Sequence, residues 1–440
     1  MKKILAFTII PTLISMNVYA EDIYISPDGS DSNSGTLSAP FATLMAAQTA
    51  ASEGDTVYIK GGTYELSTDD ISKETSVRAI VNNITKDGIN YIAYGDERPV
   101  FDFTDVLPEG LRVIGFMVSA DNCTFNGFDV VGIQITVTGK LTQSTAFRVQ
   151  DGNNNTFENL SVHDGHAIGW YLTSGSNNVV NNMDVYNNSG IDSYSYGNID
   201  GFGVHPSDSS QTGNVIRNSR AWLNTDDGFD LISAKAVVTL ENNWSFYNGY
   251  DANFVKRGDG NGFKAGGFGS NGSELPSVIP KHIIKYNLAV ANRAAGFYAN
   301  HHVDGQIWIG NTAIANNNGN YNMLSTLASD NDTDVDGYGH YMRNNLGFNG
   351  NNDKEVINLG DETENDIAYN YFNLDVSVDK NDFVSLDEDE LMEERQDDGS
   401  LPDIEYAHLT SSSDLIDAGI DIGDDYQGTA PDLGAFEYDE

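Results

Sequence analysis

Short apolar runs rich in Val, Ile, Phe and Tyr alternate with Asn-Gly and Asn-Asn pairs along most of the chain. Such runs are typical of short β-strands, and Asn and Gly are typical of the tight turns between strands. The 3.6-residue period of a long amphipathic helix is absent, although residues 41–51 form one helix-prone run. The pattern predicts an all-β chain built of many short strands.

A four-residue motif recurs through the middle of the chain and consists of a small residue, an apolar residue, any residue and Asn. The motif ends at Asn188, Asn224, Asn248, Asn292 and Asn316, at spacings of 36, 24, 44 and 24 residues. These spacings indicate a unit of 24 residues with two insertions, and a β-rich repeat of this length is typical of a solenoid. We therefore predict a right-handed parallel β-helix with three strands in each coil and about ten turns.

Stacking of such coils, roughly 4.8 Å apart, would align equivalent residues into ladders. Each motif Asn would bond through its side-chain amide to the backbone and the amide of the next coil. A second repeat, Gly followed by an aromatic residue, would align Trp170, Phe202, Phe229, Phe263 and Phe297. An aromatic ladder in the core or on the surface explains these rings without any function.

The residues that flank the aromatic rings differ from coil to coil. In the same alignment Asp200 stacks on Asp227, and Asp230 stacks beneath Lys264. Charged side chains are thus confined to neighbouring coils, with apolar or neutral residues beyond them. A random acidic surface would not produce this confinement.

The two ends of the chain depart from the repeat. Residues 1–20 have a basic start, an apolar stretch too short to span a bilayer and a small-residue cleavage site, which predicts a secretory signal peptide. We expect residues 21–440 to form a single catalytic domain, with a repeat core at about 75–370 and an irregular tail at 371–440. The helix-prone run would cap the open end of the solenoid. In the tail, residues 385–398 are predicted as a solvated loop or short helix, and residues 430–437 as a last strand docked on the stack.

Acidic residues dominate the composition, with 65 Asp and Glu against 23 Lys and Arg and a formal net charge of −42. This excess argues against nucleic acid or an anionic membrane as a partner. With the signal peptide, it predicts a secreted bacterial protein, extracellular or periplasmic, that is most simply a monomer. Because Cys123 is the single cysteine, no disulfide can form within the chain, and stability must come from a large core.

Four aspartates gather where the repeat predicts neighbouring coils. Asp226, Asp227 and Asp230 lie within five residues, and Asp200 stacks one coil away. Ionised side by side, such carboxylates repel one another, and one of them would resist ionising. A bound cation would remove the repulsion, and carboxylates without His or Cys suit Ca²⁺. A calcium site that only stabilises a turn, or a solvated turn with no cation, remains the alternative.

Lys264, one coil from these aspartates, offers either a simple ion pair or a general base. Abstraction of the C5 proton of a uronic acid is difficult, but a cation on the adjacent carboxylate would acidify that proton. A neutral Lys264 could then accept the proton, and departure of the oxygen at C4 would complete a β-elimination.

Three segments in this region, "DGFG" (200–203), "SRAWLNTDDGFDL" (219–231) and "GDGNGFKAGG" (258–267), resemble the family 9 polysaccharide lyases, whose well-known members are pectate lyases. The resemblance extends to residues 155–164, 381–387, 398–402 and 428–437. It implies a β-helix, four calcium-binding aspartates at Asp200, Asp226, Asp227 and Asp230, and Lys264 as the proton acceptor. The segments around His205, 250–260 and 322–340 depart from the family pattern and leave the exact acidic polysaccharide open.

Other motifs have weaker support. Lys256, Arg257 and Arg220 are candidates to hold substrate carboxylates, with solvated charges as the alternative. The residues Asp332, Asp334 and Asp336 alternate as in a calcium loop. Because Arg343 stands where an EF-hand needs Glu, an acidic loop is expected there, with an accessory Ca²⁺ site as the alternative. The histidines at positions 163 and 166 are interpreted as turn or core residues.

Three functions remain to be separated. The favoured hypothesis is a secreted, Ca²⁺-dependent lyase acting on polygalacturonate, with rhamnogalacturonan or alginate as alternative substrates. The second is an inverting β-helix hydrolase, such as a polygalacturonase, with Asp226 and Asp227 as acid and base; it would have no need of Lys264. The third is a non-catalytic β-helix that binds carbohydrate or acts as an adhesive surface.

Overall fold

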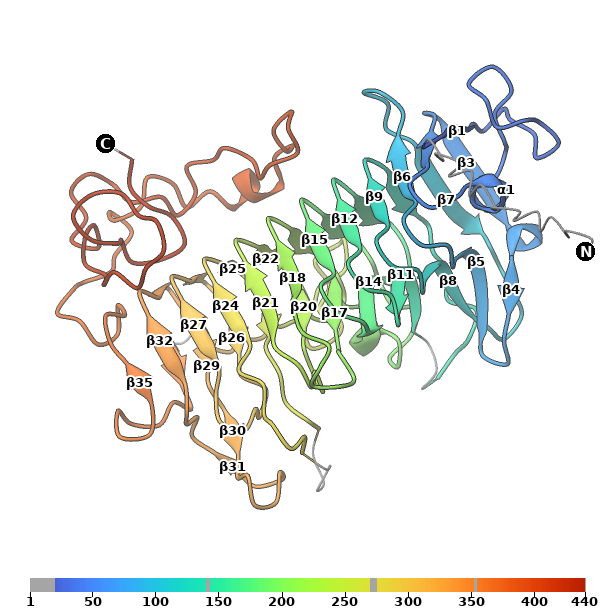
Figure 1. The fold of residues 1–440 in the computed structure, drawn as a ribbon. Coiled ribbons are helices and arrows are strands. Elements are labelled where there is room, and N and C mark those ends of the chain that lie inside the picture. The colour runs from blue at the N-terminus through green and yellow to red at the C-terminus, as the bar shows by residue number, and fades with distance from the viewer. Residues whose placement is uncertain (1–19, 140–142, 270–274, 352–353, 440) are drawn as a thin grey trace, which may run out of the picture.

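The computed structural model describes residues 20–139, 143–269, 275–351 and 354–439, and the predicted signal peptide lies almost wholly outside these ranges. Within them, short strands wind into a long stack of coils with three parallel sheets along its sides (Figure 1). The predicted parallel β-helix is confirmed, and parallel crossovers of this kind are expected to be right-handed.

The first sheet holds 12 strands among the described residues. They are β1 (Asp22–Ile25), β2 (Thr56–Ile59), β6 (Asn90–Ala93), β9 (Thr124–Asn126), β12 (Thr156–Glu158), β15 (Val179–Asn181), β18 (Asn214–Arg217), β21 (Val238–Glu241), β24 (Ile283–Lys285), β27 (Ile307–Ile309), β32 (Tyr341–Arg343) and β35 (Asp366–Ile367).

The second sheet holds 10 strands in the same ranges. They are β3 (Thr63–Ser67), β7 (Val100–Asp105), β10 (Asp129–Val131), β13 (Ser161–His163), β16 (Asp184–Tyr186), β19 (Arg220–Trp222), β22 (Trp244–Phe246), β25 (Leu288–Val290), β28 (Thr312–Ile314) and β33 (Leu346–Phe348).

The third sheet holds 11 described strands, of which β4 alone is antiparallel to its neighbour. They are β4 (Lys73–Glu74), β5 (Arg78–Ile84), β8 (Arg112–Val118), β11 (Ser144–Gln150), β14 (Ala167–Ser174), β17 (Phe202–Val204), β20 (Phe229–Asp230), β23 (Phe263–Lys264), β26 (Phe297–Tyr298), β29 (Tyr321–Asn322) and β34 (Val356–Ile357). A separate hairpin pairs β30 (Ser325–Thr326) with β31 (Asp334–Val335).

The N-terminal cap contains α1 (Leu44–Ala50), inside the predicted helical run. Thr43 caps this helix by accepting a hydrogen bond from the backbone of Ala46, and Leu44 and Ala47 are buried against the first coils. The parallel sheets already include β1 and β2, so the coils begin before residue 75, where the repeat core was expected to start. The helix and loops inserted between these strands hide the period in the sequence.

Both predicted ladders are present. The amide of Asn224 bonds to Asn248 at 3.1 Å, and equivalent bonds join Asn188, Asn292 and Asn316 into one series. The rings of Phe202, Phe229, Phe263 and Phe297 stack at 4.7–4.9 Å and are fully buried, so this aromatic ladder belongs to the core. A second Asn ladder, missed in the sequence, runs through Asn243, Asn287, Asn311, Asn345 and Asn370.

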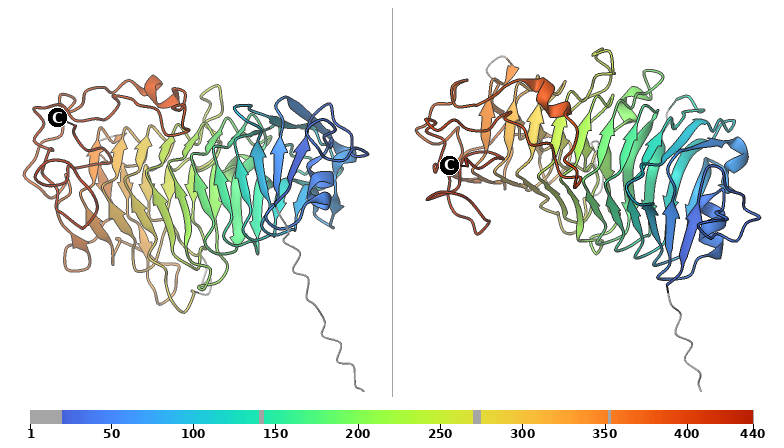
Figure 2. Two further views of the ribbon diagram at one scale, coloured as in Figure 1. Left: turned by 45° about the horizontal axis from the view of Figure 1, so that its top comes forward. Right: turned by 90° about the horizontal axis from the view of Figure 1, so that it is seen from above.

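The C-terminal tail folds back along the coils as irregular chain (Figure 2). The predicted last strand at 430–437 is wrong, because this segment pairs with no sheet in the described part of the chain. It docks instead through buried Leu433 and a bond from the backbone of Gly434 to the Asn344 carbonyl. The acidic run 385–398 does contain a short helix, η4 (Glu388–Met392). Two other short helices, η1 (Thr68–Asp70) and η2 (Tyr196–Asn198), lie elsewhere in the chain. That run is not simply solvated, because Leu391 is fully buried.

Candidate metal and catalytic site

The candidate site lies on the outer face of the third sheet, where three successive strands present charged residues in register. Phe202 aligns with Phe229 and Phe263, and one residue further along Gly203 aligns with Asp230 and Lys264. The backbone of Gly201, which follows Asp200, donates a hydrogen bond to the carbonyl of Asp227 in the next coil. The stacking predicted from the Gly-aromatic repeat is therefore present.

Close backbone approach explains the glycines before the rings. A Cβ on Gly228 would lie 2.1 Å from the Ser245 hydroxyl, so only glycine fits there. Because the buried rings fix the register, the side chains that follow them are held on the outer face of neighbouring coils.

The four predicted aspartates are all buried, with 0–5% of their surfaces exposed. Oxygens of Asp200, Asp227 and Asp230 lie within 4.8 Å of one another, a separation that allows them to share a metal ion. Asp226, on the same turn, points an oxygen at the backbone N–H of Asp259, 3.1 Å away. The donor set consists of carboxylates alone, which fits a hard cation such as Ca²⁺.

Lys264 lies against this cluster. Its Nζ is 3.1 Å from Oδ2 of Asp227 and 3.2 Å from Oδ2 of Asp230. The other oxygen of Asp227 accepts hydrogen bonds from the backbone and side-chain amides of Asn261, at 2.6 and 2.8 Å. Four carboxylates face one ammonium group, so the cluster keeps an excess of negative charge that a divalent cation can neutralise.

The electrostatics reflect this imbalance. Burial and the neighbouring carboxylates raise the pKa of Asp200 and Asp226 well above the usual range, and burial also raises the pKa of Asp227. Burial alone would lower the pKa of Lys264, but the four carboxylates raise it well above its usual value. Without a metal, Lys264 is therefore held in its charged form, and the aspartates resist full ionisation.

Two further side chains, Tyr171 and His205, complete the polar face. Nε2 of His205 lies 3.1 Å from the carbonyl oxygen of Asp230, and Nδ1 lies 3.2 Å from the hydroxyl of Tyr171. Burial lowers the pKa of His205, which favours the neutral ring. The sequence contained a signal for Tyr171, because this residue follows the aromatic residue of its own Gly-aromatic motif. That position predicts a side chain on the same sheet face as Asp230 and Lys264.

The structure places only two of the three predicted substrate-binding residues near the cluster. Lys256 and Arg257 lie in the loop before β23, which is anchored by a bond from Gly258 to the carbonyl of Thr225, next to Asp226. Lys256 is exposed. Arg257 pairs with Asp251 at 2.7 Å and lies over the ring of Tyr196.

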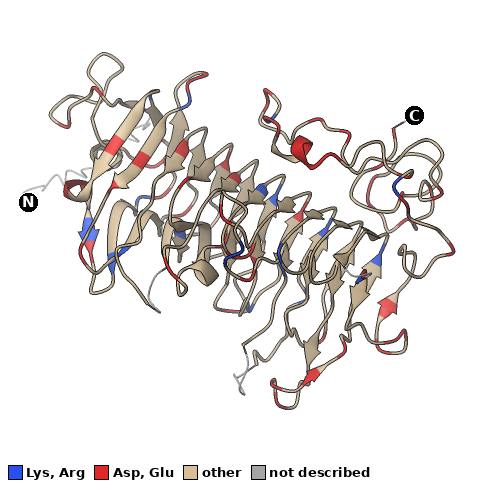
Figure 3. Ribbon diagram, turned by 180° about the vertical axis from the view of Figure 1, so that it is seen from behind, with Lys and Arg blue, Asp and Glu red and all other residues tan. Residues whose placement is uncertain are grey.

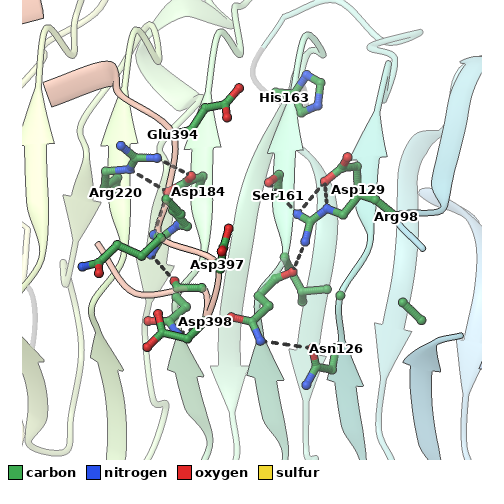
Figure 4. A pocket seen from close by; sticks show the side chains of 18 of the residues that line it. Arg98, Asn126, Asp129, Ser161, His163, Asp184, Arg220, Glu394, Asp397 and Asp398 are labelled. Carbon is green, nitrogen blue, oxygen red and sulfur yellow. Dashed lines mark hydrogen bonds and ion pairs between the residues drawn. The ribbon is translucent and has the colours of Figure 1, made fainter. Parts of the chain in front are cut away.

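Arg220 is not brought together with the aspartates, because it belongs to β19 of the second sheet. It pairs with Asp184 at 2.7 Å, as Figure 4 shows, and donates to the carbonyls of Leu391 and Glu393 in the tail. With 3% of its surface exposed, Arg220 joins the tail to the coils.

A cavity of about 940 Å³ lies beside Arg220, between the tail and the first two sheets (Figure 4). Its lining includes Arg98, Asp129, Ser161, His163 and residues 392–399. His163 is the last residue of β13 and is half-buried; it stacks on Tyr186 and pairs with Asp164, so it is a strand residue and not the predicted turn or core residue. The four aspartates and Lys264 do not line this cavity.

The acidic loop at 332–336 lies on the β30–β31 hairpin. Asp334 pairs with His301 at 2.8 Å and is largely exposed. Among the described residues, Asp332, Asp334 and Asp336 form no group able to share a metal ion. The described helices all lack the length and apolar character that a membrane crossing requires.

Comparison with known proteins identifies the architecture. Residues 23–370 match the family model "Pel9A-like, right handed beta helix region". Pectate lyase L of Dickeya chrysanthemi is 34% identical over 94% of this chain and 90% of its own length. Pectate lyase PEL9 of Emericella nidulans is 30% identical over 87% of this chain and 91% of its own length.

Two solved structures superpose along nearly the whole molecule. A rhamnogalacturonan lyase has a TM-score of 0.84 and 42% identity, covering 89% of this chain and 97% of that protein. The pectate lyase Pel9A has a TM-score of 0.76 and 30% identity, covering 96% of this chain and 98% of that protein. The chain therefore belongs to the Pel9A-like β-helix family of polysaccharide lyases, as its motifs predicted.

Proposed function

We propose that this enzyme is a secreted, calcium-dependent lyase that cleaves polygalacturonate by β-elimination, with Lys264 as the proton acceptor. The observation that carries the proposal is the contact of Lys264 with Asp227 and Asp230 on one face of adjacent strands. The pectate lyases among the relatives support the substrate class. Family membership favours elimination over hydrolysis or simple binding.

Asp200, Asp226, Asp227 and Asp230 are the proposed calcium ligands. Bound Ca²⁺ would supply positive charge to a uronate carboxylate and so acidify the proton on the neighbouring carbon. Asn261 fixes the orientation of Asp227, because both of its donors engage one carboxylate oxygen. His205 holds the Asp230 strand from the other side through the carbonyl oxygen.

Lys264 takes the C5 proton of the uronate onto Nζ. The electron pair of the broken C–H bond forms the C4–C5 double bond, and the C4–O bond breaks with its electrons on the leaving sugar oxygen, which takes a proton from solvent water. Lys264 must be neutral to begin, yet the unneutralised carboxylates hold its pKa high. The neutral lysine therefore becomes accessible as pH rises and as the carboxylate charge is neutralised.

The proposal extends to the organisation of the protein. Residues 1–20 act as the export signal, and residues 21–440 form one β-helix domain that works as a monomer outside the cytoplasm. Lys256 and Arg257, in the loop anchored beside Asp226, are proposed to contact substrate carboxylates. Arg220 instead holds the tail through its contacts with Asp184 and two tail carbonyls.

Rhamnogalacturonan is a second candidate substrate, because the solved rhamnogalacturonan lyase shares 42% identity with this chain, against 30% for Pel9A. The purified protein is incubated with polygalacturonate, rhamnogalacturonan and alginate, with Ca²⁺ or with chelator. Ultraviolet absorbance on polygalacturonate with Ca²⁺ is expected. Absorbance on rhamnogalacturonan alone would transfer the assignment to that polymer, and new reducing ends without absorbance would exclude elimination.

A further inference from the structure

Towards the N-terminus, the outer face of the third sheet continues from the candidate site into a positively charged region. Arg148 on β11 aligns with Tyr171 on β14. Tyr171 aligns with Gly203 on β17, and Gly203 aligns with Asp230 on β20. Tyr171 and His205 connect the two regions, since the Tyr171 hydroxyl contacts His205 and His205 contacts Asp230. The site and Arg148 therefore lie on one continuous face, three strand positions apart, or about 14 Å at the usual spacing.

Arg148 is buried without a carboxylate. Its guanidinium lies over the ring of Tyr171 at 5.0 Å, and among the described residues it forms no ion pair. Its Nε is buried and has no hydrogen-bond partner. Its two terminal nitrogens are not buried without a partner in this way. Arg148 keeps 7% of its surface exposed, so the outer end of the guanidinium remains open to a ligand.

Two more arginines lie at the starts of the two preceding strands, and their charges act on Arg148. Arg78 on β5 pairs in register with Arg112 on β8, and both are partly exposed. Burial, together with the charges of Arg78 and Arg112, lowers the pKa of Arg148 to about 10. Arg78 also has a buried Nε without a hydrogen-bond partner. Like charges gathered in this way repel one another unless an anion joins them.

Four other buried or half-buried arginines are neutralised by a carboxylate, whereas Arg293 donates to the backbone carbonyls of Gly258 and Asp259. Arg220 and Arg395 share Asp184, Arg257 pairs with Asp251, and Arg343 pairs with Asp366. Arg148 lacks such a partner although acidic residues outnumber basic ones 65 to 23 in the sequence. Figure 3 shows acidic positions spread along the coils and the tail, so the chain as a whole is not short of carboxylates.

We propose that Arg148, on the same sheet as Arg78 and Arg112, forms an anion subsite that binds the carboxylate of a uronate distant from the cleaved bond. This inference rests on the proposed function, because it takes the substrate to be an acidic polysaccharide laid along the third sheet. The guanidinium fork suits a planar carboxylate, and the ring of Tyr171 holds the fork in place. The subsite would favour long polymers over short oligomers, which cannot reach both regions at once.

The test compares Arg148→Gln with the wild type on polygalacturonate and on a short oligogalacturonate. Loss of a charge-assisted pair is expected to raise KM on the polymer about 10-fold or more, while kcat and the rate on the oligomer stay within about 2-fold. Arg217→Gln is the matched control, because Arg217 is exposed on the first sheet and its loss removes the same charge. An equal KM for the wild type and Arg148→Gln, or an equal rise in Arg217→Gln, would overturn the subsite.

Arg78→Gln provides a second test if Arg148→Gln does not fold, because Arg78 is partly exposed. A KM rise on the polymer but not on the oligomer is again expected, and no change would count against the subsite. A binding measurement tests the anion subsite separately from the proposed lyase activity. In a Lys264→Arg background, retention on a polygalacturonate affinity gel should fall when Arg148→Gln is added, whether or not the wild type cleaves the polymer. Unchanged retention would reject the subsite even in an active lyase.

Discussion

Two clusters of buried charge lie on different sheets of the same coils. On the second sheet, Asp184 lies between Arg220 and Arg395, each 2.7 Å away. On the third sheet, four aspartates share the single ammonium group of Lys264. The first cluster holds the tail against the coils, whereas the second faces outward with its negative charge only partly neutralised.

The pKa directions separate the two clusters, although their carboxylates are similarly buried. Burial would raise the pKa of Asp184, but the two arginines outweigh it and lower that pKa. Burial and repulsion instead raise the pKa of Asp200 and Asp226. Asp184 thus has its partners within the chain, whereas the raised pKa of Asp200 and Asp226 is consistent with a site for a cation from outside.

The largest expected effect is at Lys264. Lys264→Arg keeps the positive charge beside Asp227 and Asp230, but an arginine does not lose its proton in the working pH range. We expect kcat to fall by about 10²–10⁴, measured as initial ultraviolet absorbance on the preferred polymer. Calcium binding by the variant serves as the control and should persist. Near-normal turnover would make Lys264 an electrostatic clamp and require another base.

The next effect is on stability at the second-sheet cluster. Asp184→Ala leaves Arg220 and Arg395 buried without their carboxylate, which should cost about 3–5 kcal/mol of unfolding free energy. Because the folded pKa of Asp184 is lowered, its contribution is present above the unfolded pKa of about 3.9 and is lost as pH falls further. Urea unfolding at neutral and acid pH measures the loss of unfolding free energy and its dependence on pH. Specific activity of the folded fraction should be unchanged, and lost turnover in fully folded protein would place this cluster in the chemistry.

A smaller effect of opposite sign is expected at the third-sheet cluster without metal. Asp226→Asn removes one repelling charge and should stabilise the chelator-treated protein by about 1 kcal/mol at neutral pH. The raised pKa of Asp226 means that the wild type regains this stability as pH falls, so the difference should shrink in acid. Thermal unfolding with chelator measures the difference, and excess Ca²⁺ should reverse the order. A destabilised variant in chelator would indicate that Asp226 is a structural residue.

The smallest effect is expected at the exposed acidic loop. Asp334→Asn breaks a surface pair with His301, worth about 0–1 kcal/mol. The calcium concentration for half-maximal activity should stay within about 2-fold of the wild-type value. A clear shift would reveal a second calcium site in this loop.

The sequence predicted those parts of the fold that repeat. The Asn and Gly-aromatic periods give the coil register, and this register places Asp200, Asp227, Asp230 and Lys264 on neighbouring coils. Identical residues recurring at one position of every coil leave few alternatives for how the coils stack.

Features without a period could not be predicted in this way. Arg220 lies in a motif-bearing segment, but its side chain holds the tail. Its partners, Asp184 and the tail carbonyls, come from distant positions of the sequence, so this role could not be predicted. The tail docks through single hydrogen bonds and buried apolar residues such as Leu391 and Leu433. Arg148 carries no local motif, and its lack of a carboxylate partner is visible only in three dimensions.

Calcium dependence tests the central claim most directly. Metal-stripped protein is titrated with Ca²⁺ while bound metal and initial ultraviolet absorbance are recorded in parallel, with Asp227→Asn as the comparison. The wild type should gain activity in proportion to calcium bound at one site, and Asp227→Asn should show neither high-affinity binding nor turnover. Full activity of the wild type in excess chelator, or calcium binding that leaves the rate unchanged, would contradict the assignment of the third-sheet aspartates as the working metal site.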